Sequence, residues 1–268
     1  MIVPSPEVLD LFVVPGDLEP VAGGAGGSFR AGDLVLTPGR DPLVAPWLDP
    51  VLARLSVRLD ESPTRRPRDL RVALPVPARD GSWVVEGWGA TRFEPGTTTC
   101  DDLEVTLAAG RVLHAQLAAT VLARPPGLSE RTDPGARAER LVFGPMGDLV
   151  AAGAGTVVEP VVRAVGERLD DSDLGPDQLV HVDLARNVLL DGHGAPLVTG
   201  VVPAWRPPRW AEAVAVLDAV LRHAADREVL GAWTSGAPRQ AMLRAIAWRA
   251  LVEPEQAYGA VLSVVAAT

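Results

Sequence analysis

The spacing of apolar residues changes near residue 95, and this change restricts the chain to an α+β fold. Before it, short apolar runs alternate with turns, and the turn Asp80-Gly81 between 71–76 and 82–88 predicts a β hairpin. After it, apolar residues recur at helical spacing from Leu103 to Leu122, behind the capping pair Asp101-Asp102. The chain lacks the regular alternation of strands and helices that a doubly wound parallel sheet requires.

The predicted elements fall into two parts. Residues 7–14 suit either a short helix or a strand, because the run is too short to decide. Helices are predicted over 41–58, 103–123, 135–143, 156–169, 209–224, 239–252 and 255–266. We therefore expect an antiparallel β-rich N-lobe over 1–95 and an α-rich C-lobe over 96–268.

The segment 179–190 carries the most specific chemistry. Two apolar residues lead into His181, Asp183 and Asn187, and a second apolar run follows at Val188–Leu190. This pattern predicts a short loop held between two buried segments. A phosphotransferase uses such a pair: the aspartate orients or deprotonates the attacking hydroxyl, and the asparagine holds a metal ion that bridges phosphate oxygens.

A glycine-rich stretch lies near the start of the chain. Gly23, Gly24, Gly26 and Gly27 separate two potential strands. Glycine allows the backbone to approach a ligand closely and to direct its N–H groups at phosphate. A flexible hairpin turn without a ligand explains the same residues, and the sequence leaves both interpretations open.

Composition limits the partners and the location. The net charge of −9 argues against nucleic-acid binding, which needs a basic surface. No apolar run of about 18 residues is present, so no membrane span is predicted. The N-terminus lacks the pattern of a secretory signal, and Cys100 is the only cysteine, which excludes an internal disulfide. These features predict a cytoplasmic protein.

The chain contains no lysine. All 25 basic residues are arginines. A lysine ammonium is the compact point charge on which many phosphate-binding sites rely. Any such site in this chain must therefore use arginine or backbone N–H groups.

Several motifs in this order resemble the aminoglycoside-phosphotransferase and choline-kinase branch of the protein-kinase-like fold, and more narrowly an uncharacterised actinobacterial family of that branch. The motifs are Ser28–Leu36, Trp83–Arg92, Leu179–Leu184, Asn187–Leu189 and Trp205–Pro207. The resemblance implies a catalytic role for Asp183, a loop-supporting role for His181 and a metal-binding role for Asn187. It also implies that Gly23, Gly24, Gly26 and Gly27 form the loop that covers a nucleotide.

Two departures from that family pattern bear on activity. The strand lysine that grips the phosphates should follow Leu36, where this chain has Thr37. The second metal-binding aspartate should lie near Gly200, where no carboxylate is present. In that family the strand lysine pairs with a glutamate. This chain has no clear counterpart of that glutamate, and Asp49 is the nearest acid. Replacement of the lysine by an arginine is a further hypothesis, with two candidates, Arg30 and Arg206.

These departures favour a pseudokinase: a kinase-like protein with a degraded ATP and magnesium site that needs no cofactor and serves as a binding or scaffold subunit for a protein or peptide. The alternative hypothesis is an atypical phosphotransferase that uses ATP and Mg²⁺ to modify a hydroxyl of a small molecule or of a peptide serine or threonine. Under either hypothesis the nucleotide-binding set includes Arg30 and Thr37.

Overall fold

The computed structural model describes residues 2–21 and 26–267. The chain divides into two compact units, each formed from three segments. The first unit comprises Met1–Cys100, Ala118–Leu128 and Arg186–Val201, and the second comprises Asp101–Leu117, Ser129–Ala185 and Val202–Thr268. The first break lies close to the predicted boundary at residue 95, but the sequence pattern does not reveal that two later segments join the first unit.

The first unit contains a five-stranded antiparallel sheet in the order β1-β2-β3-β6-β5. Its strands are β1 (Glu19–Pro20), β2 (Phe29–Ala31), β3 (Leu34–Thr37), β5 (Pro75–Val76) and β6 (Gly89–Arg92). Helix α1 (Pro6–Leu11) covers one face, because Val8 and Phe12 pack with Phe29, Leu36 and other buried residues. The ambiguous run 7–14 is therefore a helix, begun by Ser5, whose hydroxyl accepts the Val8 N–H at 3.3 Å.

The predicted hairpin around Asp80-Gly81 is present, but its second strand begins later than expected. β5 pairs with β6, which starts at Gly89, whereas Ser82 was expected to open the strand. Within 82–88 the chain instead makes a tight turn, with Glu86 and Gly87 both at positive φ. The apolar residues on either side of that turn are buried, so they reproduce the pattern of a strand without forming one.

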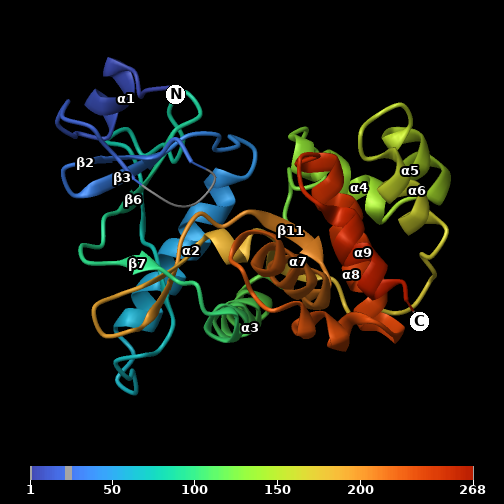
Figure 1. Ribbon diagram of the computed structural model, residues 1–268. Helices are drawn as coiled ribbons and strands as arrows, with labels where there is room; N and C mark the ends of the chain where they lie inside the picture. The colour runs from blue at the N-terminus through green and yellow to red at the C-terminus, as the bar shows by residue number, and fades with distance from the viewer. Residues whose placement is uncertain (1, 22–25, 268) are drawn as a thin grey trace. The chain divides into compact units, whose positions relative to one another are not determined.

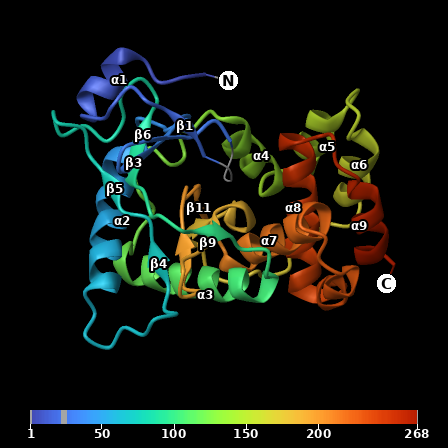
Figure 2. The same cartoon turned by 60° about the vertical axis from the view of Figure 1, so that its left-hand side comes forward.

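A second sheet of four strands completes the first unit. It has the order β4-β10-β9-β7, in which only the β4–β10 pair is parallel. Its strands are β4 (Arg71–Val72), β7 (Thr98–Thr99), β9 (Val188–Leu190) and β10 (Pro196–Val198). Helix α2 (Ala45–Asp60) contacts β4 and β5, and Figure 2 shows α1 and α2 on opposite sides of β3 and β6.

The second unit is mainly helical. It contains most of α3 (Leu103–Thr120), together with α4 (Pro134–Val142), α5 (Met146–Gly153), α6 (Glu159–Gly166), α7 (Pro208–Arg222), α8 (Gly236–Val252) and α9 (Tyr258–Val265). Helices α7 and α8 pack side by side (Figure 1). Strands β8 (Gln178–His181) and β11 (Pro203–Arg206) form an antiparallel pair, and a 3₁₀ helix spans Arg227–Trp233. A shorter 3₁₀ helix, Leu184–Arg186, lies at the boundary between the two units. The α+β class predicted from the sequence is confirmed.

The helical predictions agree with this unit except around α5. Helix α5 lies between the predicted helices 135–143 and 156–169, in a stretch for which no helix was predicted. Asp102 caps α3 as predicted, since its Oδ1 accepts the N–H groups of Glu104 and Val105 at 2.8 and 3.1 Å. Within the described residues, no helix is both long and apolar enough to cross a membrane.

The packing of α3 generates a first prediction. A methyl group on Gly110 would overlap the buried Leu184 side chain, which directly follows Asp183. Gly110→Ala should therefore lower the free energy of unfolding by about 1–3 kcal/mol, because overpacking outweighs the better helix propensity of alanine. Urea denaturation measures the change. Gly147→Ala is the control, since Gly147 is exposed on α5 with open space around it, and equal stability of the two variants would contradict the packing described.

Candidate functional site

The segment predicted to carry the chemistry begins on a buried strand of the second unit. Leu179 and Val180 of β8 are completely buried, and β8 pairs with β11 so that His181 lies opposite Pro203. The pairing continues past the strand, because the Val182 N–H donates to the Val202 carbonyl at 3.0 Å. The expected buried entry to the loop is therefore present.

His181 holds the backbone of this segment. Its Nδ1 accepts the N–H of Asp183 at 3.3 Å and the N–H of Val202 at 3.2 Å. Its own N–H donates to Nε2 of His114 at 3.1 Å. A neutral His114 is required for that last contact, and burial lowers the pKa of His114 to about 4. His114, a buried residue of α3, thus supports the loop.

Asp183 lies buried in an ion-pair network. Its carboxylate accepts a hydrogen bond from the guanidinium of Arg249 on α8, and the same guanidinium pairs with Asp218 on α7. Arg249 is 3% exposed and Asp218 is fully buried. Burial lowers the pKa of Arg249, but the attraction of Asp218 and Asp183 is larger in sum and raises it above its usual value. The arginine is therefore held charged between two carboxylates.

Further groups extend this network along α7, α8 and α9. Glu253 lies 3.5 Å from Arg249, and Arg222 pairs with both Glu253 and Asp218. The Tyr258 hydroxyl donates to the Arg249 and Glu253 carbonyls at 3.0 and 2.7 Å, and burial raises the pKa of Tyr258 to about 12. The environment of Asp183 is thus fixed by three C-terminal helices.

Asn187 belongs to the first unit and lies against Gly200. Both flank the β9–β10 pair, and the Thr199 N–H donates to the Asn187 carbonyl at 2.8 Å. Gly200 has φ +49°, and a Cβ there would lie 2.5 Å from Asn187 Oδ1. An aspartate at position 200 would therefore displace the Asn187 amide. Asn187 and a carboxylate at position 200 could therefore hold a metal together only if the Asn187 side chain moved from the position observed.

The residues present do not fit a magnesium site. Asp191 precedes the position of the missing ligand in the sequence, and Asp218 follows it. Asp218 faces Arg249, and Asp191 accepts the backbone N–H groups of His193 and Ala195, with Arg71 3.8 Å away. Among residues 2–21 and 26–267, no group of three or more His, Cys, Asp or Glu side chains is arranged to hold a metal ion.

The described members of the predicted nucleotide-binding set lie on β2, at the end of β3 and in the segment that leads into β2. Gly23 and Gly24 fall outside the described residues, whereas Gly26 and Gly27 have φ values of +81° and +78°. Thr37 occupies the last position of β3, and its hydroxyl oxygen accepts the Ser28 hydroxyl at 3.2 Å. Strands β1 and β2 pair on either side of the glycine-rich stretch, which leaves both interpretations of it open, and Thr37 is bound to the residue that precedes β2.

The two arginines suggested as substitutes for lysine are bound elsewhere. Arg30 contacts Glu19 at 3.3 Å and the Gly32 carbonyl at 3.1 Å, and stacks over Phe93. Arg206, in the second unit, donates to Glu139 at 2.7 Å and stacks over Phe143. In the positions observed, both side chains are engaged by these other groups, and replacement of the lysine by either arginine stays a hypothesis.

A different arginine, which the sequence pattern did not single out, pairs with Asp49. Arg40 follows the turn after β3, and its guanidinium donates to Asp49 on α2. Asp49 is only 3% exposed, and burial raises its pKa while the charge of Arg40 opposes that rise. A polar residue at a helix position among buried leucines is the signal that could have indicated this pair.

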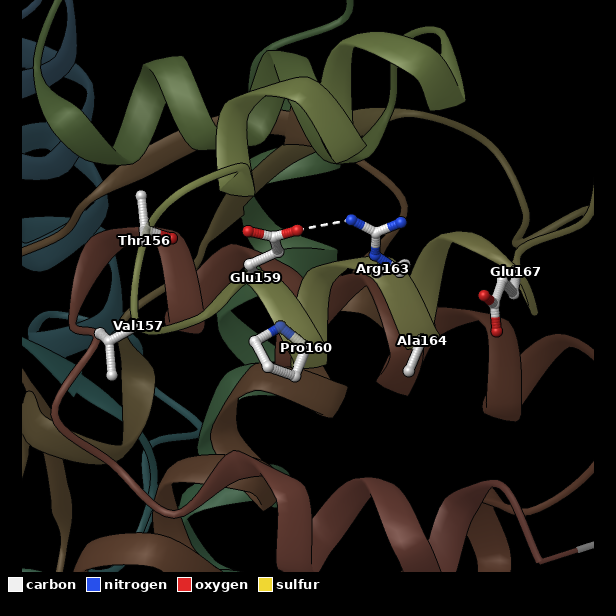
Figure 3. Close-up of a pocket in the computed structure, with 7 residues that line it drawn as sticks. All are labelled: Thr156, Val157, Glu159, Pro160, Arg163, Ala164 and Glu167. Carbon is white, nitrogen blue, oxygen red and sulfur yellow. Dashed lines mark hydrogen bonds and ion pairs between the residues drawn. The ribbon is translucent and has the colours of Figure 1, made fainter.

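A surface hollow at the start of α6 contains none of these residues. It is lined by Thr156, Val157, Glu159, Pro160, Arg163, Ala164 and Glu167 (Figure 3). Glu159 and Arg163 point toward each other, 2.5 Å apart, and Glu159 also accepts the Gly155 N–H. Glu159 and Arg163 are thus paired with each other, and the lining of the hollow does not indicate a particular ligand.

Comparison with known proteins yields structural likenesses alone. No protein-family model and no curated protein matches the sequence. The choline kinase LicA from Streptococcus pneumoniae is similar at 12% identity over 94% of this chain and 86% of that chain, with a TM-score of 0.49. A choline/ethanolamine kinase family protein from Mesorhizobium loti has 18% identity over 98% and 89%, with a TM-score of 0.43.

A third similar structure is the gentamicin–APH(2")-IIa complex. The identity is 12% over 100% of this chain and 98% of that chain, and the TM-score is 0.49. These likenesses have TM-scores below 0.5 and concern the fold alone. They assign no activity to this chain and no role to its residues.

Burial of neutral His114 predicts a pH dependence. Its pKa is about 4 in the folded chain against 6.5 for an ordinary histidine, so the unfolded chain binds an extra proton between these values. Stability should be complete above pH 6.5 and fall by up to about 3 kcal/mol as the pH drops to 4. In His114→Gln, which keeps an acceptor for the His181 N–H, this slope should disappear.

Urea denaturation between pH 4 and 7 measures that slope. His193→Gln is the matched control, because His193 is exposed. A His114→Gln variant with the wild-type slope would show that His114 is not buried in its neutral form.

The Arg249 network predicts a large effect on stability. Arg249→Met would leave Asp183 and Asp218 buried without their shared cation, which typically costs about 3–5 kcal/mol. Adding Asp218→Asn should restore part of the loss, because one buried charge is removed. Arg209→Met, on the exposed side of α7, should change stability by less than about 0.5 kcal/mol. Similar melting temperatures for all three variants would contradict the network.

Proposed function

We propose that this chain is a pseudokinase: a kinase-like protein without phosphotransfer activity that serves as a binding or scaffold subunit for a protein or peptide. The observation that carries the proposal is the engagement of Asp183 by Arg249. In the family that the sequence resembles, this aspartate must accept or orient a hydroxyl. A guanidinium N–H bound to one of its oxygens competes with any hydroxyl for that role.

The arrangement of Asn187 and Gly200 supports the same proposal. Phosphoryl transfer depends mainly on positioning and on neutralisation of charge by metal ions and basic groups. Loss of one comparable electrostatic contact typically costs about 3–4 kcal/mol of transition-state stabilisation, a factor of about 10² to 10³ in rate. In this chain, the lysine at position 37 and the carboxylate at position 200 are both replaced. No cofactor is expected under this proposal.

The proposal also includes a class of partner and a location. An acidic peptide is one candidate for the arginine-rich loop at 65–71, where Arg66 and Arg68 are exposed. Arg65 and Arg71 already pair with Asp60, which reduces the charge that the loop can offer. A single cysteine supports a cytoplasmic location.

The alternative is an atypical phosphotransferase that uses ATP and Mg²⁺ on a hydroxyl of a small molecule or of a peptide serine or threonine. The Arg40–Asp49 pair favours it, because an arginine linked to an acid of α2 offers a cation near the β3 strand in place of lysine. This alternative requires a metal ion to bind in spite of the contact between Asn187 and Gly200.

One experiment separates the two functions. Melting temperature is measured with ATP and Mg²⁺ and with ATP and EDTA, and ATP consumption is followed in wild type, Asp183→Asn and Asn187→Ala. A pseudokinase should show no metal-dependent stabilisation and the same background turnover in all three proteins. Metal-dependent stabilisation that Asn187→Ala removes, or turnover that Asp183→Asn abolishes, would establish the phosphotransferase instead.

A further inference from the structure

The loop between α2 and β4 presents its arginines on two consecutive turns. The Ser62 carbonyl accepts the Arg65 N–H at 3.0 Å, and the Arg66 carbonyl accepts the Asp69 N–H at 3.1 Å. Each turn has a proline at its second position, where the ring fixes φ at the value that the turn requires. The Asp69 carboxylate also accepts the Arg66 N–H at 2.8 Å. Figure 2 shows the loop extending past the end of α2 before the chain enters β4.

Two other arginines hold the base of this loop. Arg65 lies 3.4 Å from Asp60, the last residue of α2, and Arg71 lies 3.3 Å from Asp60 and 3.0 Å from Glu94. Asp191 accepts backbone N–H groups of its own turn and lies 3.8 Å from Arg71. The acids beside the base are therefore engaged there.

Arg66 and Arg68 are left without a carboxylate. Both residues are exposed, and no acid in the described part of the chain pairs with either guanidinium. A Cβ at Gly194 would lie 3.9 Å from Arg68 Nε, so the Arg68 side chain lies along the turn that contains Gly194. Because the backbone of both arginines is held before a partner arrives, binding at this loop requires little further ordering.

The surroundings of these two guanidiniums suit an acidic peptide better than a nucleic acid. Glu61 and Asp69 are exposed in the same loop, and the net charge of the chain is −9, so a continuous row of phosphates would be repelled. Separate carboxylates on a peptide can reach the arginines and avoid these acids. Val57, which is 44% exposed in the last turns of α2, offers an apolar contact for a peptide side chain.

We propose that Arg66 and Arg68, positioned by the two proline turns, dock an acidic segment of a partner polypeptide whose apolar side chain covers Val57. A guanidinium binds a carboxylate through two parallel N–H···O bonds, a geometry that lysine lacks. This inference deepens the proposed function, on which it rests for the class of partner. It assigns the contact to one loop and names the chemistry of the partner.

The test is fluorescence anisotropy of the full chain with a labelled peptide of glutamate, glycine and leucine, compared with the same peptide carrying glutamine for glutamate. Arg66→Gln with Arg68→Gln should weaken binding at least about fivefold at low salt, because two exposed ion pairs are lost. The matched control is Arg124→Gln with Arg227→Gln. It removes two exposed arginines outside the loop, with the same change of net charge, and should bind as wild type does.

A further variant keeps every charge and loosens the second turn. Pro67→Gly should weaken binding about threefold, because the free loop gains conformations that must be lost when the peptide binds. A cooperative thermal transition at the temperature of wild type verifies that each variant is folded.

Binding that needs both the glutamates of the peptide and the two loop arginines supports the proposal. Equal binding of the two peptides, wild-type affinity in the Arg66 and Arg68 variant or in Pro67→Gly, or equal loss in both arginine variants would overturn it. So would tighter binding of a single-stranded oligonucleotide through the same arginines, or self-association of wild type that the loop variant lacks, which would assign the loop to a nucleic acid or to a second copy.

Failure of the pseudokinase proposal is a separate outcome. It would appear as metal-dependent stabilisation or as turnover that needs Asp183, and neither measurement uses the loop variants.

Discussion

The attraction between one buried arginine and two buried aspartates is the interaction on which the second unit depends. Arg249 is surrounded by apolar residues of α7 and α8, and its charge is tolerated only because Asp218 and Asp183 neutralise it. Transfer of these charged groups from water to the interior costs free energy unless they are paired. Asp183 and Asp218 are therefore held in position by Arg249, as Arg249 is by them. The aspartate that the sequence marks as catalytic is thereby part of the structural framework.

Glycines determine the polar arrangement of the first unit. At Gly200 the lack of a side chain admits the Asn187 amide, and at Gly89 it admits the stem of Arg40. In both places a larger residue would change which polar group occupies the space. At Gly200, one of the two departures from the kinase pattern, the Asn187 amide thus occupies the volume that a side chain would fill.

Much of the fold could be predicted because it depends on local patterns. The apolar runs on either side of His181 and Asp183 indicated β8 and β9, and the helical stripe after Asp102 indicated α3. The strand expected at Ser82 was misplaced because buried residues on both sides of a turn imitate alternation. Partners distant in sequence could not be derived from local patterns. Even so, Arg249 within an apolar helix was a signal that a buried charge needed a partner.

The ion pair that joins the Asp183 segment to α8 also affects the local unfolding of that segment. Fluctuations that expose a single loop usually break few contacts and cost little. Here, withdrawal of Asp183 from Arg249 would uncover charges that α7, α8 and α9 hold together through Asp218, Glu253 and Tyr258. The Asp183 segment is thus joined to the helices of the second unit, and its backbone amides should exchange with solvent only when that unit unfolds.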